Sequence, residues 1–147
     1  MANGRGLGKL VTSHMSVVRN IKVFVADDSI VLRERVLEML REIPGVEIVG
    51  CSEEGLHAID CIRHLRPDVV VLDIQMPRGT GLDVLKNTCT GPGSPMFVIF
   101  TNFPYPQYRK RALDYGAEYF FDKTTEFEQL RDLFGQLTGG LPAGAVH

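Results

Sequence analysis

The chain has 147 residues, which suits one domain with short ends, because domains typically run to about 100 to 200 residues. With 44% hydrophobic and 23% charged residues, its composition excludes the disordered, collagen-like and disulfide-scaffold classes. Lysine and arginine number 16 and aspartate and glutamate 18, so the net charge of −2 offers no general attraction to nucleic acid or to anionic lipid.

Targeting signals and cysteine usage indicate the cellular compartment of the protein. No apolar run approaches the roughly 20 residues that cross a bilayer, and the first residues lack the apolar segment of a signal peptide. We therefore expect a cytoplasmic protein without membrane insertion. The cysteines, Cys51, Cys61 and Cys89, are odd in number and irregularly spaced, which argues against a disulfide framework. Cys61 and His64 form a Cys-x-x-His pair, but a metal site needs two more ligands at suitable spacing, so ordinary packed thiols are favoured.

Both ends of the chain lack a core pattern. Residues 1–19 are glycine-rich and carry basic residues without an acid, which predicts a disordered leader or a segment upstream of a start at Met15. Residues 138–147 are expected to form a flexible tail. The folded domain is therefore expected at residues 20–137.

Between these ends, short apolar runs alternate with stretches of helical periodicity. This alternation is typical of an α/β fold in which helices connect the strands of a parallel sheet. Three runs are apolar on successive residues, as strands covered on both faces must be, so the sheet should be a central layer. The predicted strands are Lys22–Ala26, Glu47–Cys51, Val69–Leu72, Met96–Thr101 and Glu118–Phe121.

A helix is predicted after each strand. The first runs from about Ser29 to Glu42 and ends at Pro44. Ser52 is expected to cap the second helix. The inward-facing residues of this second helix should be Leu56, Ile59, Ile62 and Leu65.

The remaining three helices have local start and stop signals. The third follows Thr80, and the fourth begins near Pro106, a favoured residue of the first turn, and ends at Gly116. The fifth presents apolar residues at helical spacing. These are Phe127, Leu130, Leu133, Phe134 and Leu137.

Polar residues close four of the five predicted strands. Asp27 and Asp28 follow the first strand, Asp73 follows the third, Thr101 ends the fourth, and Lys123 follows the fifth. Ligands of open parallel sheets bind beyond the carboxyl ends of the strands, and adjacent strands lie about 4.8 Å apart. These five side chains should therefore share one pocket.

The chemistry of this pocket follows from its charges. Carboxylates about 4 to 6 Å apart repel each other by about 3 to 4 kcal/mol per pair at an effective dielectric near 20, so three of them need a cation. Hard oxygen ligands with open positions suit Mg²⁺. With an ammonium from Lys123 and a hydroxyl from Thr101, the pocket is suited to a carboxylate that accepts a phosphoryl group.

Each residue also has a purely structural explanation. Asp28 with Ser29 could be a helix N-cap, Asp73 a turn residue, Lys123 a solvated charge and Thr101 an ordinary strand residue. Their joint occurrence at strand ends favours the shared site. A dinucleotide site is disfavoured because no Gly-x-Gly-x-x-Gly follows the first strand, and no nucleophilic serine motif is evident. A haloacid-dehalogenase-like phosphatase would have a second aspartate two residues past its nucleophile, where this chain has Gln75.

These residues resemble the receiver domain of bacterial two-component response regulators. The resemblance covers about Ile21 to Leu137. It rests on the motifs Val-Phe-Val-Ala-Asp-Asp-Ser, Pro-Asp-Val-Val-Val-Leu-Asp-Ile-Gln-Met-Pro, Ile-Phe-Thr and Gly-Ala-Glu-Tyr-Phe-Phe-Asp-Lys. It implies a (βα)5 flavodoxin-like fold, similar to that of the stand-alone chemotaxis regulator, with strand order 2-1-3-4-5.

The resemblance also implies a role for each site residue. Asp73 would be the phosphoacceptor and a metal ligand, Asp28 a direct Mg²⁺ ligand, Asp27 a ligand through water, and Gln75 a ligand through its backbone carbonyl. No organic cofactor is implied.

Two of the implied roles concern the switch. Thr101 and Lys123 would bind the phosphoryl oxygens, and Phe120 resembles the aromatic residue that turns inward when Thr101 moves toward the phosphoryl group. Gln75 and Phe103 occupy positions that tune dephosphorylation in this family. The domain would dephosphorylate itself slowly, and it would not otherwise be an enzyme.

Partners follow from the same resemblance. A sensor histidine kinase or phosphotransfer protein would donate the phosphoryl group. An unidentified downstream protein would bind the face made by the fourth helix, fifth strand and fifth helix, with no direct contact to nucleic acid.

Four residues depart from the family pattern. Phe120 replaces the commoner tyrosine, so no hydroxyl is available there for a hydrogen bond. Thr124 replaces the proline that usually follows the lysine, so a cis peptide is not expected after Lys123. Asn102 and Phe103 are bulky at positions that control access to the phosphoryl group.

The output of the domain has alternatives. A DNA-binding module needs some 60 residues and only about ten follow Leu137, so a stand-alone receiver is expected. The alternatives are the receiver of a truncated DNA-binding regulator, a pseudo-receiver that phosphorylation does not switch, and a small Mg²⁺-dependent phosphotransferase or phosphatase.

Overall fold

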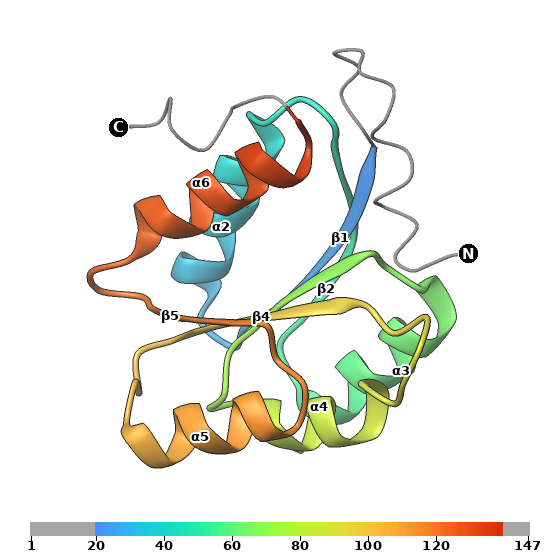
Figure 1. Ribbon diagram of the computed structural model, residues 1–147, viewed down its shortest axis with the longest axis vertical. Helices are drawn as coiled ribbons and strands as arrows, with labels where there is room; N and C mark the ends of the chain where they lie inside the picture. The colour runs from blue at the N-terminus through green and yellow to red at the C-terminus, as the bar shows by residue number, and fades with distance from the viewer. Residues whose placement is uncertain (1–19, 140–147) are drawn as a thin grey trace.

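The computed structural model describes residues 20–139, which alternate strand and helix as the sequence predicts (Figure 1). The predicted leader at residues 1–19 and most of the predicted tail lie outside the described residues. The elements are β1 (Ile21–Ala26), α2 (Ile30–Arg41), β2 (Val46–Ser52), α3 (Gly55–Leu65), β3 (Val69–Leu72), α4 (Gly81–Thr88), β4 (Met96–Thr101), α5 (Pro106–Asp114), β5 (Tyr119–Asp122) and α6 (Phe127–Leu137).

The five strands form one parallel sheet in the order β2-β1-β3-β4-β5, which confirms the predicted flavodoxin-like topology. Two helices, α2 and α6, cover one face, and α3, α4 and α5 cover the other (Figure 1). Because both faces are covered, the four residues of β3 are all buried, which explains its uninterrupted apolar sequence. No helix within residues 20–139 is long and apolar enough to cross a membrane.

The sheet separates two apolar clusters. Successive residues of β1 alternate between them, since side chains of a strand point to opposite faces. Phe24 packs with α3, α4 and α5, whereas Val23 and Val25 pack with α2 and α6. The fully buried Phe97 and Phe134 are large side chains of the two clusters, one in each.

Local capping signals set the helix starts. The Ser29 hydroxyl accepts a hydrogen bond from the Leu32 N–H at the start of α2. At α4, Thr80 and Asp83 form a reciprocal capping box. Pro106 occupies the first turn of α5, as predicted. All ten elements therefore begin within about three residues of their predicted positions.

Two predictions for α3 are wrong. Ser52 is the last residue of β2, paired with Ala26, and Glu54 is the residue at the N-cap of α3. Leu56 and Leu65 do not face inward, because these residues are 61% and 38% exposed. The start of α3 packs instead through Gly55, whose missing side chain lets the backbone of Gly79 approach it closely.

Candidate functional site

The sheet topology brings the predicted polar residues to one edge. Asp27 and Asp28 follow β1, and Asp73 follows β3, the strand that pairs directly with β1. The direction in which the chain adds strands to the sheet reverses here. Helix α2 leads from β1 to β2 on one side of β1, and α3 leads from β2 to β3 on the other side of β1. In doubly wound sheets such a reversal opens a crevice at the carboxyl ends of the strands, where ligands bind.

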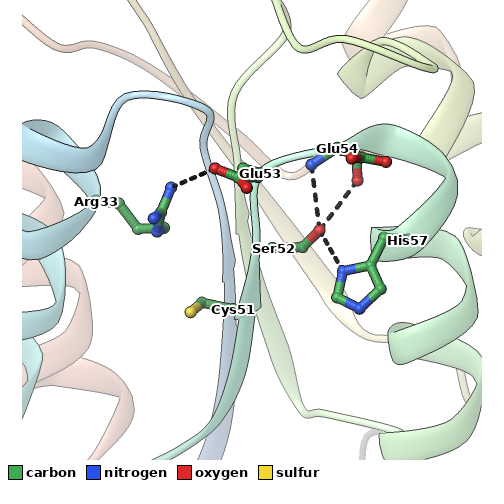
Figure 2. A pocket seen from close by; sticks show the side chains of 6 residues that line it. All are labelled: Arg33, Cys51, Ser52, Glu53, Glu54 and His57. Atoms are coloured by element: carbon green, nitrogen blue, oxygen red, sulfur yellow. Dashed lines mark hydrogen bonds and ion pairs between the residues drawn. The ribbon is translucent and has the colours of Figure 1, made fainter.

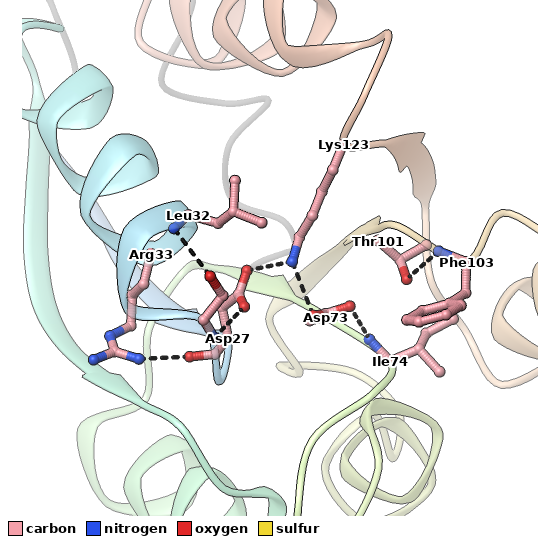
Figure 3. A network of polar contacts seen from close by, with 9 residues as sticks. Asp27, Leu32, Arg33, Asp73, Ile74, Thr101, Phe103 and Lys123 are labelled. Atoms are coloured by element: carbon pink, nitrogen blue, oxygen red, sulfur yellow. Dashed lines mark hydrogen bonds and ion pairs between the residues drawn. The ribbon is translucent and has the colours of Figure 1, made fainter.

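Lys123 joins the two buried aspartates. Its Nζ lies 2.6 Å from an oxygen of Asp27 and 2.9 Å from an oxygen of Asp73. Figure 3 shows the lysine side chain reaching between the two carboxylates. All three residues are buried, with 3%, 5% and 7% of Asp27, Asp73 and Lys123 exposed. Two buried carboxylates are therefore held close together by a single cation.

Asp73 has both carboxylate oxygens engaged. One accepts from Lys123, and the other accepts a 2.7 Å hydrogen bond from the Ile74 N–H. Burial raises the pKa of Asp73, the Lys123 ammonium opposes that rise, and the neighbouring Asp27 charge adds to it. Because burial outweighs the lysine, keeping Asp73 ionised costs folding free energy when no further cation is near.

The Asp27 carboxylate and backbone are also fixed. The Ser29 N–H donates to one of its carboxylate oxygens at 2.9 Å, and Arg33 donates to its backbone carbonyl at 2.7 Å. The Asp27 N–H donates to the Ser52 carbonyl at the end of β2. Sequence reasoning did not single out Arg33, since a lone arginine in an exposed helix pattern carries no motif.

The three aspartates match the donor set of a magnesium site. Asp28 is exposed, and carboxylate oxygens of Asp27, Asp28 and Asp73 all lie within 4.8 Å of one another. Hard oxygen donors at this spacing fit Mg²⁺, which binds through a few carboxylates and retains waters. The exposed Asp28 gives the ion a route from solvent.

The loop between β3 and α4 carries Gln75, whose carbonyl is the fourth predicted ligand. Two anchors hold this loop. The Gly81 N–H donates to the Ile74 carbonyl at 2.8 Å, and the first N–H groups of α3 donate to the carbonyls of Pro77 and Arg78. The Gln75 side chain is exposed, with its amide nitrogen 3.5 Å from the Tyr108 hydroxyl, at the outer limit of a hydrogen bond.

Thr101 lies on the opposite side of Asp73 from Asp27 (Figure 3). It is fully buried, and its hydroxyl oxygen accepts a 3.0 Å hydrogen bond from the Phe103 N–H. The hydroxyl therefore keeps its own proton available for another acceptor. Phe103 itself is half-buried, with its ring centroid 6.2 Å from that of Tyr105.

Phe120 on β5 is 5% exposed, so the predicted switch aromatic occupies an inward position in this structure. The guanidinium carbon of Arg109 on α5 lies 4.7 Å from the centre of its ring. This cation–π contact links α5 to β5. All peptide bonds of the described residues are trans, which confirms the prediction for the bond after Lys123.

A polar groove of about 460 Å³ lies beside the site, between the starts of α2 and α3 (Figure 2). The side chains that line it are Arg33, Cys51, Ser52, Glu53, Glu54 and His57. It borders the end of β2 and is not the crevice that holds Asp73. No motif in the sequence predicts this groove.

Comparison with known families identifies the fold and the family of the chain. The model of the response regulator receiver domain family matches residues 23–134, most of the chain. The chain is a response regulator receiver domain. It therefore belongs to the two-component signalling systems, and its sheet topology is that of its family.

Curated relatives of this receiver domain are longer proteins. A protein-glutamate methylesterase/protein-glutamine glutaminase of Methanospirillum hungatei is 36% identical over 119 residues, which are 80% of this chain and 35% of the relative. A similarly named protein of Desulfotalea psychrophila is 37% identical over 111 residues, which are 74% of this chain and 30% of the relative. The receiver domain thus spans about a third of the length of these relatives.

Solved structures give the same family. The response regulator domain of Thermotoga maritima CheB aligns with a TM-score of 0.71 and 26% identity, covering 84% of this chain and 99% of that one. A DNA-binding response regulator of the LuxR family from Staphylococcus aureus aligns with a TM-score of 0.73 and 27% identity, covering 80% and 98%. Receivers from proteins with different outputs are therefore about equally similar to this chain in structure.

Proposed function

We propose that this receiver domain is a switch operated by phosphorylation of Asp73. The observation that carries the proposal is the buried Asp27–Lys123–Asp73 arrangement beside the exposed Asp28. In the transfer, a carboxylate oxygen of Asp73 attacks the phosphorus of a phosphohistidine. A P–O bond forms, the P–N bond breaks, and its electron pair returns to the imidazole of the donor.

The residues present would hold Mg²⁺ through Asp27, Asp28, Asp73 and the Gln75 carbonyl. When bound, the ion would supply positive charge to the phosphoryl oxygens. The Lys123 ammonium, which two carboxylates share, can bind a phosphoryl oxygen once Asp73 has become an acyl phosphate and its carboxylate has lost its charge. The Thr101 hydroxyl can donate to a second phosphoryl oxygen, because the Phe103 N–H leaves its proton free.

A protein donor is supported by apolar side chains around this edge. Ile30 and Val31, which follow the acid pair, are 62% and 69% exposed, and Leu56 at the start of α3 is 61% exposed. Exposed apolar residues at the starts of α2 and α3 favour a protein surface over a small soluble substrate. The donor we propose is a sensor histidine kinase or a phosphotransfer protein, and the receiver would then act in the cytoplasm.

The signal would leave through the face of α5, β5 and α6. Thr101 ends β4 at the phosphoacceptor, and the buried Phe120 on the neighbouring β5 lies under Arg109 of α5. A shift of the Thr101 hydroxyl toward the phosphoryl group would change the packing beside Phe120. It would thereby alter the populations of the conformations that this face adopts. Tyr105 and Tyr119 are 49% and 39% exposed there and offer contacts to a downstream protein.

The intact set of acids and lysine favours a phosphorylated receiver over a pseudo-receiver, in which one of these groups would be absent. The receiver would not itself turn over a soluble substrate, and its one hydrolytic reaction would be slow loss of its own phosphoryl group. The same switch could act on a methylesterase or a DNA-binding module in a longer protein, as the names of similar proteins suggest.

The deciding experiment uses intact mass spectrometry. The full chain is incubated with Mg²⁺ and a small acyl phosphate, alongside Asp73→Asn and a sample containing a chelator. We expect a mass gain of one phosphoryl group that requires both Mg²⁺ and Asp73. If the wild-type chain gains no mass with acyl phosphate or with a histidine kinase donor, and does not bind BeF₃⁻, the pseudo-receiver explanation is correct.

A further inference from the structure

Two metal-ligand side chains meet on α3, away from the aspartate site. His57 and Cys61 are four residues apart, so they are neighbours on the same helix face. The His57 Nε2 and the Cys61 Sγ lie 3.5 Å apart. Cys61 is half-buried against the apolar cluster, whereas His57 is exposed and borders the polar groove (Figure 2). The pair can therefore be reached from solvent through the exposed His57.

The Ser52 hydroxyl lies within hydrogen-bond distance of the His57 imidazole. The Ser52 hydroxyl has one proton, and it donates to the Glu54 carbonyl at 3.1 Å, a group that can only accept. The His57 Nδ1 lies 2.8 Å from the same hydroxyl oxygen (Figure 2), and in the tautomer with the proton on Nδ1 it donates to that oxygen. In that tautomer the lone pair of the neutral imidazole is on Nε2, which faces Cys61.

With the proton on Nδ1, His57 has the arrangement of a metal-binding histidine. Such histidines bind the ion through one ring nitrogen and donate a hydrogen bond through the other. In tetrahedral zinc sites the Zn–S and Zn–N distances are about 2.3 and 2.0 to 2.1 Å, which places the two ligand atoms about 3.5 to 3.6 Å apart. The observed 3.5 Å between Nε2 and Sγ equals that span.

A third ligand is available on the same face. At about 100° per residue, His57, Cys61 and His64 lie within roughly 60° of one another around the helix. His64 is exposed, so its side chain can rotate toward Cys61. We propose that His57, Cys61 and His64 form a binding site for a divalent transition metal ion of the zinc class, with water as the remaining ligand.

The chemistry separates this site from the aspartate site. Imidazole and thiolate ligands select zinc-class ions, whereas carboxylates and carbonyls suit Mg²⁺. Without metal, burial raises the pKa of Cys61, with Asp60 and Cys51 adding to the rise, so the thiol is protonated and can donate to Nε2. Metal binding breaks the S–H bond, forms the metal–sulfur bond in its place and releases the proton to solvent.

Cobalt(II) is a suitable probe because a cobalt–thiolate bond gives a sulfur-to-metal absorption band. The reduced full chain is titrated with Co²⁺ in excess Mg²⁺, which occupies the aspartate site. We expect one thiolate-bound cobalt per chain. Cys61→Ser and His57→Ala should abolish the band, and His64→Ala and Ser52→Ala should weaken binding by about 10- to 100-fold.

Matched controls test the assignment. Cys51→Ser, Cys89→Ser and a chain with both His14 and His147 replaced by alanine should bind cobalt as the wild type does. Circular dichroism checks that each variant folds, and His57→Asn serves if His57→Ala does not. The proposal is overturned if the wild type gives no sulfur band, or if Cys61→Ser, His57→Ala or His64→Ala binds cobalt as tightly as the wild type. These outcomes do not depend on phosphorylation of Asp73.

Discussion

Asp73 is the residue in which the requirements of folding and of function conflict most directly. Its carboxylate is buried and its pKa is raised by that burial, yet both phosphoryl transfer and Mg²⁺ binding need it ionised. Lys123 compensates for only part of this cost, because it is shared with Asp27. In the metal-free domain, the buried negative charge of Asp73 is therefore unfavourable, and it lies where a cation would bind.

Asp73→Asn should stabilise the metal-free domain at neutral pH, by about 1 to 3 kcal/mol. When folding raises the pKa of a carboxyl, protonation of that carboxyl stabilises the folded domain. The free energy of unfolding of the wild type should therefore increase relative to that of the variant as the pH falls through the raised pKa. The difference in free energy of unfolding between Asp73→Asn and the wild type should therefore shrink as the pH is lowered toward the ordinary pKa range of carboxyl groups. Urea denaturation with a chelator present, across this pH range, measures both effects.

The matched control for this measurement is Asp114→Asn, which changes an exposed acid on α5 and should leave the free energy of unfolding nearly unchanged. A variant Asp73→Asn that is less stable than the wild type at neutral pH would show that the hydrogen bonds to Lys123 and Ile74 outweigh the burial of the charge.

Phe103 is the second residue whose role can be measured directly. Its N–H orients the Thr101 hydroxyl, and its half-buried ring lies near the phosphoacceptor edge (Figure 3). Phe103→Ala keeps the N–H and removes the ring that limits access of water. We expect the phosphoryl group on Asp73 to be lost about three- to tenfold faster, a barrier change of about 0.7 to 1.4 kcal/mol.

The decay is followed by intact mass after the acyl phosphate donor is removed. Leu113→Ala, on the exposed side of α5, is the control and should leave the lifetime unchanged. An equal lifetime for Phe103→Ala and the wild type would mean that the ring does not limit water access.

At the scale of elements, the β3–α4 loop and the start of α3 depend on each other. Glu54 at the N-cap makes no side-chain capping bond, so the carbonyls of Pro77 and Arg78 accept from the N–H groups of Gly55 and Leu56 instead. A Cβ on Gly55 would overlap the backbone of Gly79. One helix thereby holds in place the loop that carries the predicted metal-ligating carbonyl.

Gly55→Ala should lower the free energy of unfolding by about 2 to 3 kcal/mol, because backbone atoms of the loop cannot move aside as a flexible side chain could. It should also weaken Mg²⁺ binding through displacement of the Gln75 carbonyl. Chemical denaturation and calorimetric Mg²⁺ titration test the two effects. Leu56→Ala, one residue along but 61% exposed, should cost less than about 0.5 kcal/mol. Similar losses for the two variants would contradict the close approach.

At the scale of the whole molecule, the site draws its residues from strands that are far apart in sequence. Asp27 and Lys123 are nearly a hundred residues apart along the chain, yet they form a 2.6 Å ion pair. A ligand that binds only this assembled arrangement must stabilise the entire domain, since the unfolded chain presents no such site.

Saturating Mg²⁺ should therefore raise the melting temperature. At a Mg²⁺ concentration a hundredfold above its dissociation constant, the free energy of unfolding should increase by about 2.7 kcal/mol. Asp28→Asn should reduce the Mg²⁺-induced shift by more than half while leaving the metal-free melting temperature close to that of the wild type, because Asp28 is exposed. Differential scanning calorimetry measures both. Glu38→Gln, an exposed acid on α2, is the control, and an equal shift in Asp28→Asn would exclude Asp28 as a ligand.

The sequence by itself determined the order and type of the elements and the polar residues that end the strands. Those signals are local: apolar periodicity, caps and strand-end carboxylates are carried by neighbouring residues. It also predicted the pocket, because the carboxyl ends of parallel strands meet at one edge. Burial was harder to predict, as the exposed Leu56 and Leu65 show, since helical spacing indicates a face but not how far neighbouring elements cover it.

Only the tertiary structure decided which groups touch. The position of Lys123 between two carboxylates, the inward ring of Phe120 and the approach of Gly55 to Gly79 depend on contacts between distant segments and on side-chain rotamers. The same holds for His57, which sequence spacing did not connect with Cys61. Its ring direction is set by Ser52 on a neighbouring strand, and no periodicity along the chain encodes such a contact.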